Sequence, residues 1–125
     1  MYHVTKTQKV RQFTRAMGQP LDVEPTPDLA RLRQDLIMEE AGEVWEELER
    51  PVISKAKLTK ELADLLYVVY GTALAFGLPL DPAFNRVHES NMSKLVDGKP
   101  LYREDGKVLK GPNYQPPVLD DLFNG

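Results

Sequence analysis

Five acidic residues in the middle of the chain form two short clusters. The first contains Glu39, Glu40 and Glu43, and the second, after seventeen intervening residues, contains Glu61 and Asp64. Both stretches have helical periodicity, and at about 100° per residue most of these acids fall on the apolar face of their helix, with Glu39 at its edge. An ordinary amphipathic helix carries its acids on the opposite face, so this pattern indicates a site.

Two facing helices that each direct a carboxylate pair inward require a cation between them. Burying an ionised carboxylate without a partner is costly, and clustered carboxylates repel until some take up protons. A hard divalent ion with oxygen ligands removes both costs, and Mg²⁺ or Mn²⁺ suits an all-carboxylate site. The alternative is a solvated acidic patch, because Glu46, Glu47 and Glu49 crowd the end of the same helix and Glu47 also points near the apolar face.

Length and composition narrow the class of protein. At 125 residues we expect one domain, and a net charge of −3 without a basic stripe argues against nucleic acid as a partner. The absence of cysteine excludes disulfides and thiolate metal sites. The first ten residues lack the apolar core of a signal peptide, and the most apolar run, 65–80, is shorter than the roughly 20 residues of a membrane span. We therefore expect a cytoplasmic protein without a membrane partner.

Periodicity and caps predict four helices, over about 5–17, 27–50, 56–76 and from 81 onward. Thr26, Pro27 and Asp28 combine a cap, a first-turn proline and a first-turn acid, and Asp81 with Pro82 repeats the cap and the proline. The third helix is apolar nearly all round, which requires protein on every side. A chain this short has too few helices to surround it, so we expect a homo-oligomer, either a dimer or a dimer of dimers.

The last thirty residues are predicted to leave the helical pattern. The segment 101–110 is typical of a hairpin with Asp105 and Gly106 at its turn, and the prolines after it favour an extended tail. The expected architecture is all-α and resembles a four-helix bundle. It forms one domain, with a helical core over 1–96 and a hairpin and tail over 97–125 that pack on the core, cover the acids or clasp a neighbouring subunit.

Three polar residues outside the acidic clusters are candidates for substrate binding. Asn91 and Lys94 lie one turn apart on the fourth helix, and an amide beside an ammonium suits sugar and phosphate groups. Arg33 faces inward on the second helix, where it could serve phosphate or pair with an acid.

The spacing EExxE followed by ExxD, met here by Glu39–Glu43 and Glu61–Asp64, resembles the metal signature of the all-α nucleoside triphosphate pyrophosphohydrolases. That superfamily includes MazG, the dimeric dUTPases and phosphoribosyl-ATP pyrophosphohydrolase. The likeness extends to ELADLLYVVYGTALAFGLPLD, HESNMSKL and DGKPLYREDGKVLKGPNYQPP, which are similar to a MazG-like subgroup of short bacterial and phage proteins. The MazG fold and a bacterial or phage-infected cytoplasm are what this resemblance implies.

The resemblance also implies a reaction and roles for residues. It implies hydrolysis of a nucleotide between its α and β phosphates, giving a monophosphate and pyrophosphate, with a slight lean to dGTP or GTP as substrate. Glu39 would orient or deprotonate the attacking water. The implied Mg²⁺ ligands are Glu40, Glu43, Glu61 and Asp64, and the implied nucleotide-binding residues are Asn91 and Lys94, with Arg33, Lys110 and Tyr114 as further candidates.

Three alternatives compete with this reading. The first is a phosphoribosyl-ATP pyrophosphohydrolase, which shares the fold and the acids. The second is a carboxylate-bridged di-iron bundle, which needs two Glu-x-x-His pairs, whereas the only histidines are His3 and His88, and Asn85 precedes His88 by three residues. The third is a non-catalytic helical oligomer with a structural metal site, against which Glu39 argues because it adds a fifth acid to four ligands.

Overall fold

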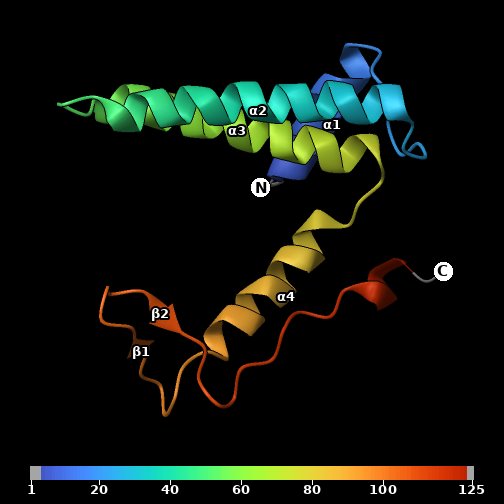
Figure 1. Ribbon diagram of the computed structural model, residues 1–125. Helices are drawn as coiled ribbons and strands as arrows, with labels where there is room; N and C mark the ends of the chain where they lie inside the picture. Colours follow the sequence, from blue (N-terminus) through green and yellow to red (C-terminus); the bar gives the residue numbers. More distant parts are fainter. Residues whose placement is uncertain (1–3, 124–125) are drawn as a thin grey trace. The chain divides into compact units, whose positions relative to one another are not determined.

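The computed structural model describes residues 4–123, and its regular structure is dominated by helices (Figure 1). The four helices are α1 (Lys6–Ala16), α2 (Pro27–Glu49), α3 (Lys55–Ala75) and α4 (Leu80–Met92). They are followed by strands β1 (Leu101–Tyr102) and β2 (Val108–Leu109) and a 3₁₀ turn at Asp120–Phe123. The predicted all-α class and its four helices are confirmed.

The chain divides between Leu78 and Pro79 into two compact units. The first unit contains α1, α2 and α3, and the second contains α4, the β1–β2 hairpin and the tail. The sequence had placed α4 with the helical core and begun the tail segment at residue 97. The structure groups α4 with the tail instead, because the polar groups of α4 bond to it. A single domain for the whole chain stays a prediction.

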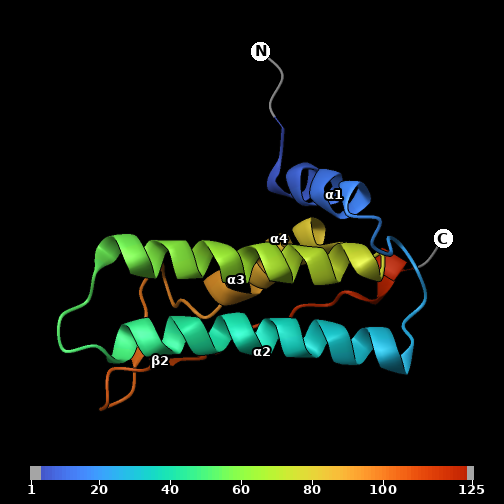
Figure 2. The same cartoon turned by 90° about the horizontal axis from the view of Figure 1, so that it is seen from above.

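Within the first unit, α2 and α3 run antiparallel side by side, and α1 packs on α3 (Figure 2). The hydroxyls of Thr5, Thr26 and Ser54 cap α1, α2 and α3 by accepting hydrogen bonds from backbone N–H groups in the first turn. Both α1 and α3 end at a glycine with positive φ, Gly18 and Gly77, in the left-handed conformation that closes many helices. These local signals explain why the predicted helix boundaries lie within a residue or so of the observed ones.

The segment between α1 and α2 is attached to the end of α3. The N–H groups of Asp22 and Val23 donate to the carbonyls of Leu74 and Ala75 at 2.9 Å each. Among residues 4–123 the buried apolar side chains are few: Val10 on α1, and Ala73, Leu74 and Ala75 at the end of α3. The long α2–α3 pair therefore extends well beyond the buried core.

Within the second unit, α4 begins at Leu80 with Pro79 as its N-cap, so the prediction that Asp81 caps the helix is wrong. Asp81 lies instead in the first turn, because Leu80 already has helical geometry. The predicted hairpin is confirmed: Leu101 pairs with Leu109 and Tyr102 with Val108, and Gly106 takes a positive φ at the turn.

Over residues 4–123, no single helix has both the length and the apolar character to cross a bilayer. Only α3 and α4 counted together, as a bent pair, would meet that requirement, and they do so by length and composition alone.

Candidate metal centre

Four carboxylates from two helices meet in the first unit. Glu40 and Glu43 come from α2, Glu61 and Asp64 come from α3, and one oxygen from each lies within 4.8 Å of all the others. The spacing of three residues places each pair on one face of its helix, and the antiparallel packing turns the two faces toward each other. These are the four residues that the sequence singled out as ligands.

The cluster has unsatisfied acceptors at its centre. All four side chains are half-buried, and the Oε2 atoms of Glu40 and Glu61 are buried without a hydrogen-bond partner. A buried acceptor left without a donor is costly, and more so when it carries charge. Four carboxylates with two orphaned oxygens form a donor set that fits a hard divalent cation such as Mg²⁺.

The crowding of the acids changes the pKa of Glu61. Its pKa is raised, first by a hydrogen bond to the carboxyl group of Glu43, then by burial, and opposed by the nearby charge of Lys60. Burial and neighbouring carboxylates both disfavour the ionised form. Glu61 therefore binds a proton more readily than an isolated glutamate does.

Lys60 supplies a positive charge beside the same acids. Its ammonium lies 2.6 Å from Oδ2 of Asp64 and 3.5 Å from Oε1 of Glu61, and its pKa is raised chiefly by the hydrogen bond to Asp64. The sequence analysis missed Lys60. The signal was available, since Lys60 precedes Asp64 by four residues on one helix face.

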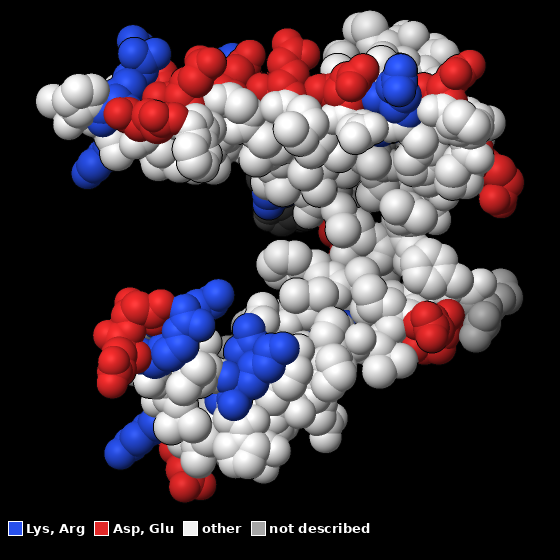
Figure 3. Space-filling model, in the orientation of Figure 1, with Lys and Arg blue, Asp and Glu red and all other residues white. Residues whose placement is uncertain are grey.

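Glu39 lies apart from the four-carboxylate cluster, on the exposed side of α2. Figure 3 shows acidic side chains in a row along α2 in the first unit. Asp35 and Glu46 are exposed in the same way as Glu39. Glu39 thus stands outside the four-carboxylate cluster, and its catalytic role stays a prediction.

Glu47, which the sequence placed near the apolar face of α2, is the one buried acid among residues 4–123. Its Oε2 accepts a hydrogen bond from Nε of Arg50 at 2.8 Å, and this pair ends the helix. Arg50 neutralises Glu47, so this acid has a local partner and the four-carboxylate cluster does not include it.

Arg33 bonds to α3. Its Nε donates to Oγ1 of Thr72 and its Nη2 donates to the carbonyl of Val68, both at 3.0 Å. Burial lowers the pKa of this guanidinium. The observed partners of Arg33 are thus uncharged acceptors on α3, not the phosphate or the acid that the sequence suggested. A role for Arg33 in nucleotide binding stays a prediction.

The other predicted nucleotide-binding residues belong to the second unit. Asn91 is exposed on α4, and Lys94 is half-buried just beyond its end. The ammonium of Lys110 lies 4.8 Å from the ring centre of Tyr114, a cation–π contact. The roles of all four in nucleotide binding stay predictions.

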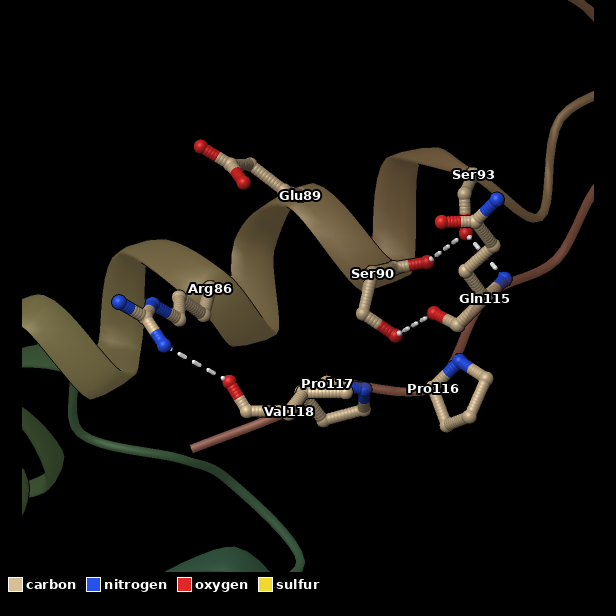
Figure 4. A pocket seen from close by; sticks show the side chains of 8 residues that line it. All are labelled: Arg86, Glu89, Ser90, Ser93, Gln115, Pro116, Pro117 and Val118. Atoms are coloured by element: carbon tan, nitrogen blue, oxygen red, sulfur yellow. Dashed lines mark hydrogen bonds between the residues drawn. The ribbon is translucent and has the colours of Figure 1, made fainter. Parts of the chain in front are cut away.

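A pocket of about 240 Å³ lies in the second unit between α4 and the tail (Figure 4). Its polar groups are largely used in holding the tail. Ser90 Oγ donates to the carbonyl of Gln115 at 2.7 Å, the N–H of Gln115 donates to Ser93 Oγ at 3.0 Å, and Arg86 donates to the carbonyl of Val118 at 3.0 Å. We interpret this pocket as part of the packing contact between the tail and α4.

Residues 10–91 match the sequence model of a family described as phosphoribosyl-ATP pyrophosphohydrolase. The chain belongs to this family. The match contains all five acids and both helices of the carboxylate cluster, and it confirms the resemblance to the all-α nucleotide pyrophosphohydrolases. The matched segment ends at Asn91 on α4. The hairpin and the tail lie beyond it.

A curated relative is an uncharacterized protein of Acanthamoeba polyphaga mimivirus. It is 33% identical over 84 residues, which are 62% of this chain and 33% of the viral protein. The chain therefore spans about a third of the length of this relative.

Proposed function

We propose that the protein is a Mg²⁺-dependent pyrophosphohydrolase that converts a nucleoside or deoxynucleoside triphosphate to the monophosphate and pyrophosphate, and so controls a nucleotide pool. The observation that carries this proposal is the meeting of four carboxylates within 4.8 Å, two of them with buried, unpartnered oxygens. Membership of a family named for a nucleotide pyrophosphohydrolase supports it. Mn²⁺ is expected to substitute for Mg²⁺, since both prefer oxygen ligands.

The four clustered acids would hold the cation. Glu40 and Glu61 each present a buried oxygen that lacks a donor, and Glu43 and Asp64 complete a set with contributions from both helices. When bound, Mg²⁺ supplies positive charge that stabilises the developing charge on phosphoryl oxygens. Because the pKa of Glu61 is raised, cation binding is expected to compete with protonation of this carboxyl group.

Glu39 is proposed to orient the attacking water and accept its proton. Its exposure and its place on the same helix, next to Glu40, leave its carboxylate available to solvent. A carboxylate that is not used as a metal ligand is free to accept a proton from the attacking water. Water would then attack the α-phosphorus, the α–β anhydride bond would break, and pyrophosphate would leave.

Two substrate classes are in contention within this reaction. We propose a nucleoside triphosphate from the MazG-like motifs, and dGTP or GTP is the preferred candidate within that class. Phosphoribosyl-ATP is the second candidate, and the description of the matching family favours it. Both carry the same α–β anhydride bond, so the acid cluster serves either.

The deciding experiment measures pyrophosphate release from eight common ribo- and deoxyribonucleoside triphosphates and from phosphoribosyl-ATP. Each reaction is run with Mg²⁺, with Mn²⁺ and with EDTA, and the Glu61→Gln variant serves as a matched control for contaminating hydrolases. Release that requires metal and disappears in the variant supports the proposal and names the substrate. No release from any substrate in either metal would favour a structural ion site instead.

We also propose that a second copy of the chain covers the α2–α3 pair. Large apolar side chains on these helices are strongly exposed, with Trp45 at 67%, Met38 at 66% and Leu48 at 51%. Exposed apolar surface on this scale marks an interaction site, and the buried core of the first unit is too small to stabilise the pair by itself. A dimer, or a dimer of dimers, is the assembly we expect.

Light scattering after gel filtration tests this assembly, and Trp45 provides an internal probe because it is the sole tryptophan. A multimer with blue-shifted emission from Trp45, shifting to the red on dilution to monomer, supports the proposal. A stable monomer with the emission of a water-exposed indole would contradict it. We expect this assembly in the cytoplasm, in keeping with a chain that has no cysteine.

A further inference from the structure

Arg33 joins α2 to α3 through a closed set of hydrogen bonds. Its Nε donates to Oγ1 of Thr72, and its Nη2 donates to the carbonyl of Val68, each at 3.0 Å. The hydroxyl of Thr72 in turn donates to the same Val68 carbonyl at 2.9 Å. A planar guanidinium whose two donors bond to two fixed acceptors constrains both the axial position and the angle of α2 relative to α3.

Gly71 makes this contact possible. A Cβ atom built on Gly71 would lie 2.6 Å from Nη2 of Arg33 and 3.5 Å from Cζ, so an alanine there would displace the guanidinium. Gly71 is itself buried and lies inside α3, near its C-terminal end, and glycine within a helix costs about 1 kcal/mol relative to alanine. The close approach of Arg33 gives a physical reason for a residue that otherwise weakens α3.

The contact and the acid cluster share one antiparallel register. Arg33 precedes Glu40 by seven residues on α2, and Gly71 follows Asp64 by seven residues on α3. The two pairs are therefore two helical turns apart on each helix, about 10 Å at 1.5 Å per residue. The axial alignment of Arg33 with Gly71 therefore also determines the axial alignment of Glu40 with Asp64.

We propose that Arg33, seated on Gly71 and Thr72, is a positioning residue that fixes the register of α2 against α3 and thereby the spacing of the four carboxylates for a divalent cation. This inference rests on the proposed metal site. Mg²⁺ accepts oxygen ligands only near 2.0–2.1 Å and in near-octahedral geometry. A slip of one residue would move one carboxylate pair by about 1.5 Å along the helix axis and rotate it, which such a site does not tolerate.

The test is the affinity of the full-length protein for Mn²⁺, measured by electron paramagnetic resonance in the absence of nucleotide. Gly71→Ala, Thr72→Val and Arg33→Lys are each expected to weaken Mn²⁺ binding about tenfold, the scale on which groups that orient metal ligands act. Thr72→Ser keeps the hydroxyl and is expected to bind Mn²⁺ like the wild-type chain. Circular dichroism and light scattering confirm that each variant keeps its helices and its assembly.

Matched controls separate register from general stability. Gly42→Ala adds a methyl group to α2 where nothing lies within 4 Å, and Thr59→Val removes a hydroxyl that bonds only to Lys55 of its own helix. Both controls should leave Mn²⁺ affinity unchanged. Because Gly71 acts through Arg33, Gly71→Ala combined with Arg33→Ala should weaken binding no more than Arg33→Ala alone.

The outcomes distinguish this inference from the proposed activity. Unchanged Mn²⁺ affinity in folded Arg33→Lys and Gly71→Ala variants, or additive effects in the double variant, would overturn the positioning role. A wild-type chain that binds Mn²⁺ but hydrolyses no nucleotide would overturn the proposed function and leave the positioning role to be decided by the same affinities. A wild-type chain that binds no Mn²⁺ would overturn both.

Discussion

Glu43 on α2 and Glu61 on α3 bring carboxylate oxygens within 4.8 Å of each other, and a hydrogen bond to Glu43 is the largest cause of the raised pKa of Glu61. The pKa of Glu61 therefore lies above the ordinary glutamate value of 4.5. Both carboxyl groups belong to the set of four that would hold a cation. Proton and metal are therefore expected to compete for this position.

The first prediction concerns stability and pH in the metal-free protein. Because the pKa of Glu61 is raised by folding, its contribution to stability is fully present below pH 4.5 and is lost as pH rises through the raised value. The free energy of unfolding of the wild-type chain should therefore fall relative to that of Glu61→Gln between pH 4.5 and neutrality. Denaturant titrations of both chains in EDTA measure this difference. A difference that does not change with pH would show that Glu61 is ionised normally in the folded chain.

The second prediction concerns Glu39 as the base. Glu39→Gln should lower kcat by about 10²- to 10⁴-fold, the range that a positioned general base supplies, while Mn²⁺ affinity stays within about twofold of wild type. Glu46→Gln, an exposed acid on the same helix, is the matched control and should leave both values unchanged. Retained turnover in Glu39→Gln would remove Glu39 from the mechanism and leave the metal ligands in place.

The third prediction concerns Lys60, whose ammonium lies 2.6 Å from Asp64. Lys60→Met should tighten Mn²⁺ binding by about two- to fivefold. The metal ion then no longer has to displace the Lys60 ammonium from the acids, and it is no longer repelled by that charge. The effect is modest since the Lys60 side chain is 66% exposed and solvent screens it. Lys57→Met, an exposed lysine one turn earlier on α3, is the control. Weaker Mn²⁺ binding in Lys60→Met would instead show that Lys60 holds the acids in place.

The fourth prediction concerns the attachment of the tail to α4. Gly111 is buried, its N–H donates to the carbonyl of Lys94 at 3.2 Å, and an added Cβ would lie 2.7 Å from that carbonyl oxygen. Gly111→Ala should therefore release the tail and speed amide hydrogen exchange by at least about tenfold at residue 111 and at Tyr114 and Gln115, whose N–H groups are hydrogen-bonded. A local opening of about 1.4 kcal/mol corresponds to that factor. Gln115→Ala is the control, because Gln115 bonds to Ser90 and Ser93 through its backbone alone. Exchange that stays slow in Gly111→Ala would mean that the tail does not depend on this contact.

Much of the fold could be predicted because its signals are local. A hydroxyl at Thr26 followed by Pro27 satisfies the first N–H groups of α2 wherever the helix lies, and Gly77 ends α3 because the chain must turn there with positive φ. The hairpin turn at Asp105 and Gly106 is equally local. The N-cap of α4 was placed two residues late, at Asp81, because Asp81 and Pro82 carry the ordinary cap signal, whereas the actual N-cap, Pro79, makes no side-chain cap hydrogen bond.

The candidate site divides in the same way. Spacing of three residues determined that each acid pair shares a helix face, since that follows from helical geometry alone. Only the packing of α2 on α3 decided that the four oxygens meet within 4.8 Å and that Glu39 lies outside them. The partner of Arg33 likewise depended on tertiary structure: its inward angle was readable, but the carbonyl of Val68 and the hydroxyl of Thr72 lie more than thirty residues away in the sequence. Periodicity specifies which side of a helix is buried, whereas the atoms opposite that side are set by the register between helices, and no local signal carries it.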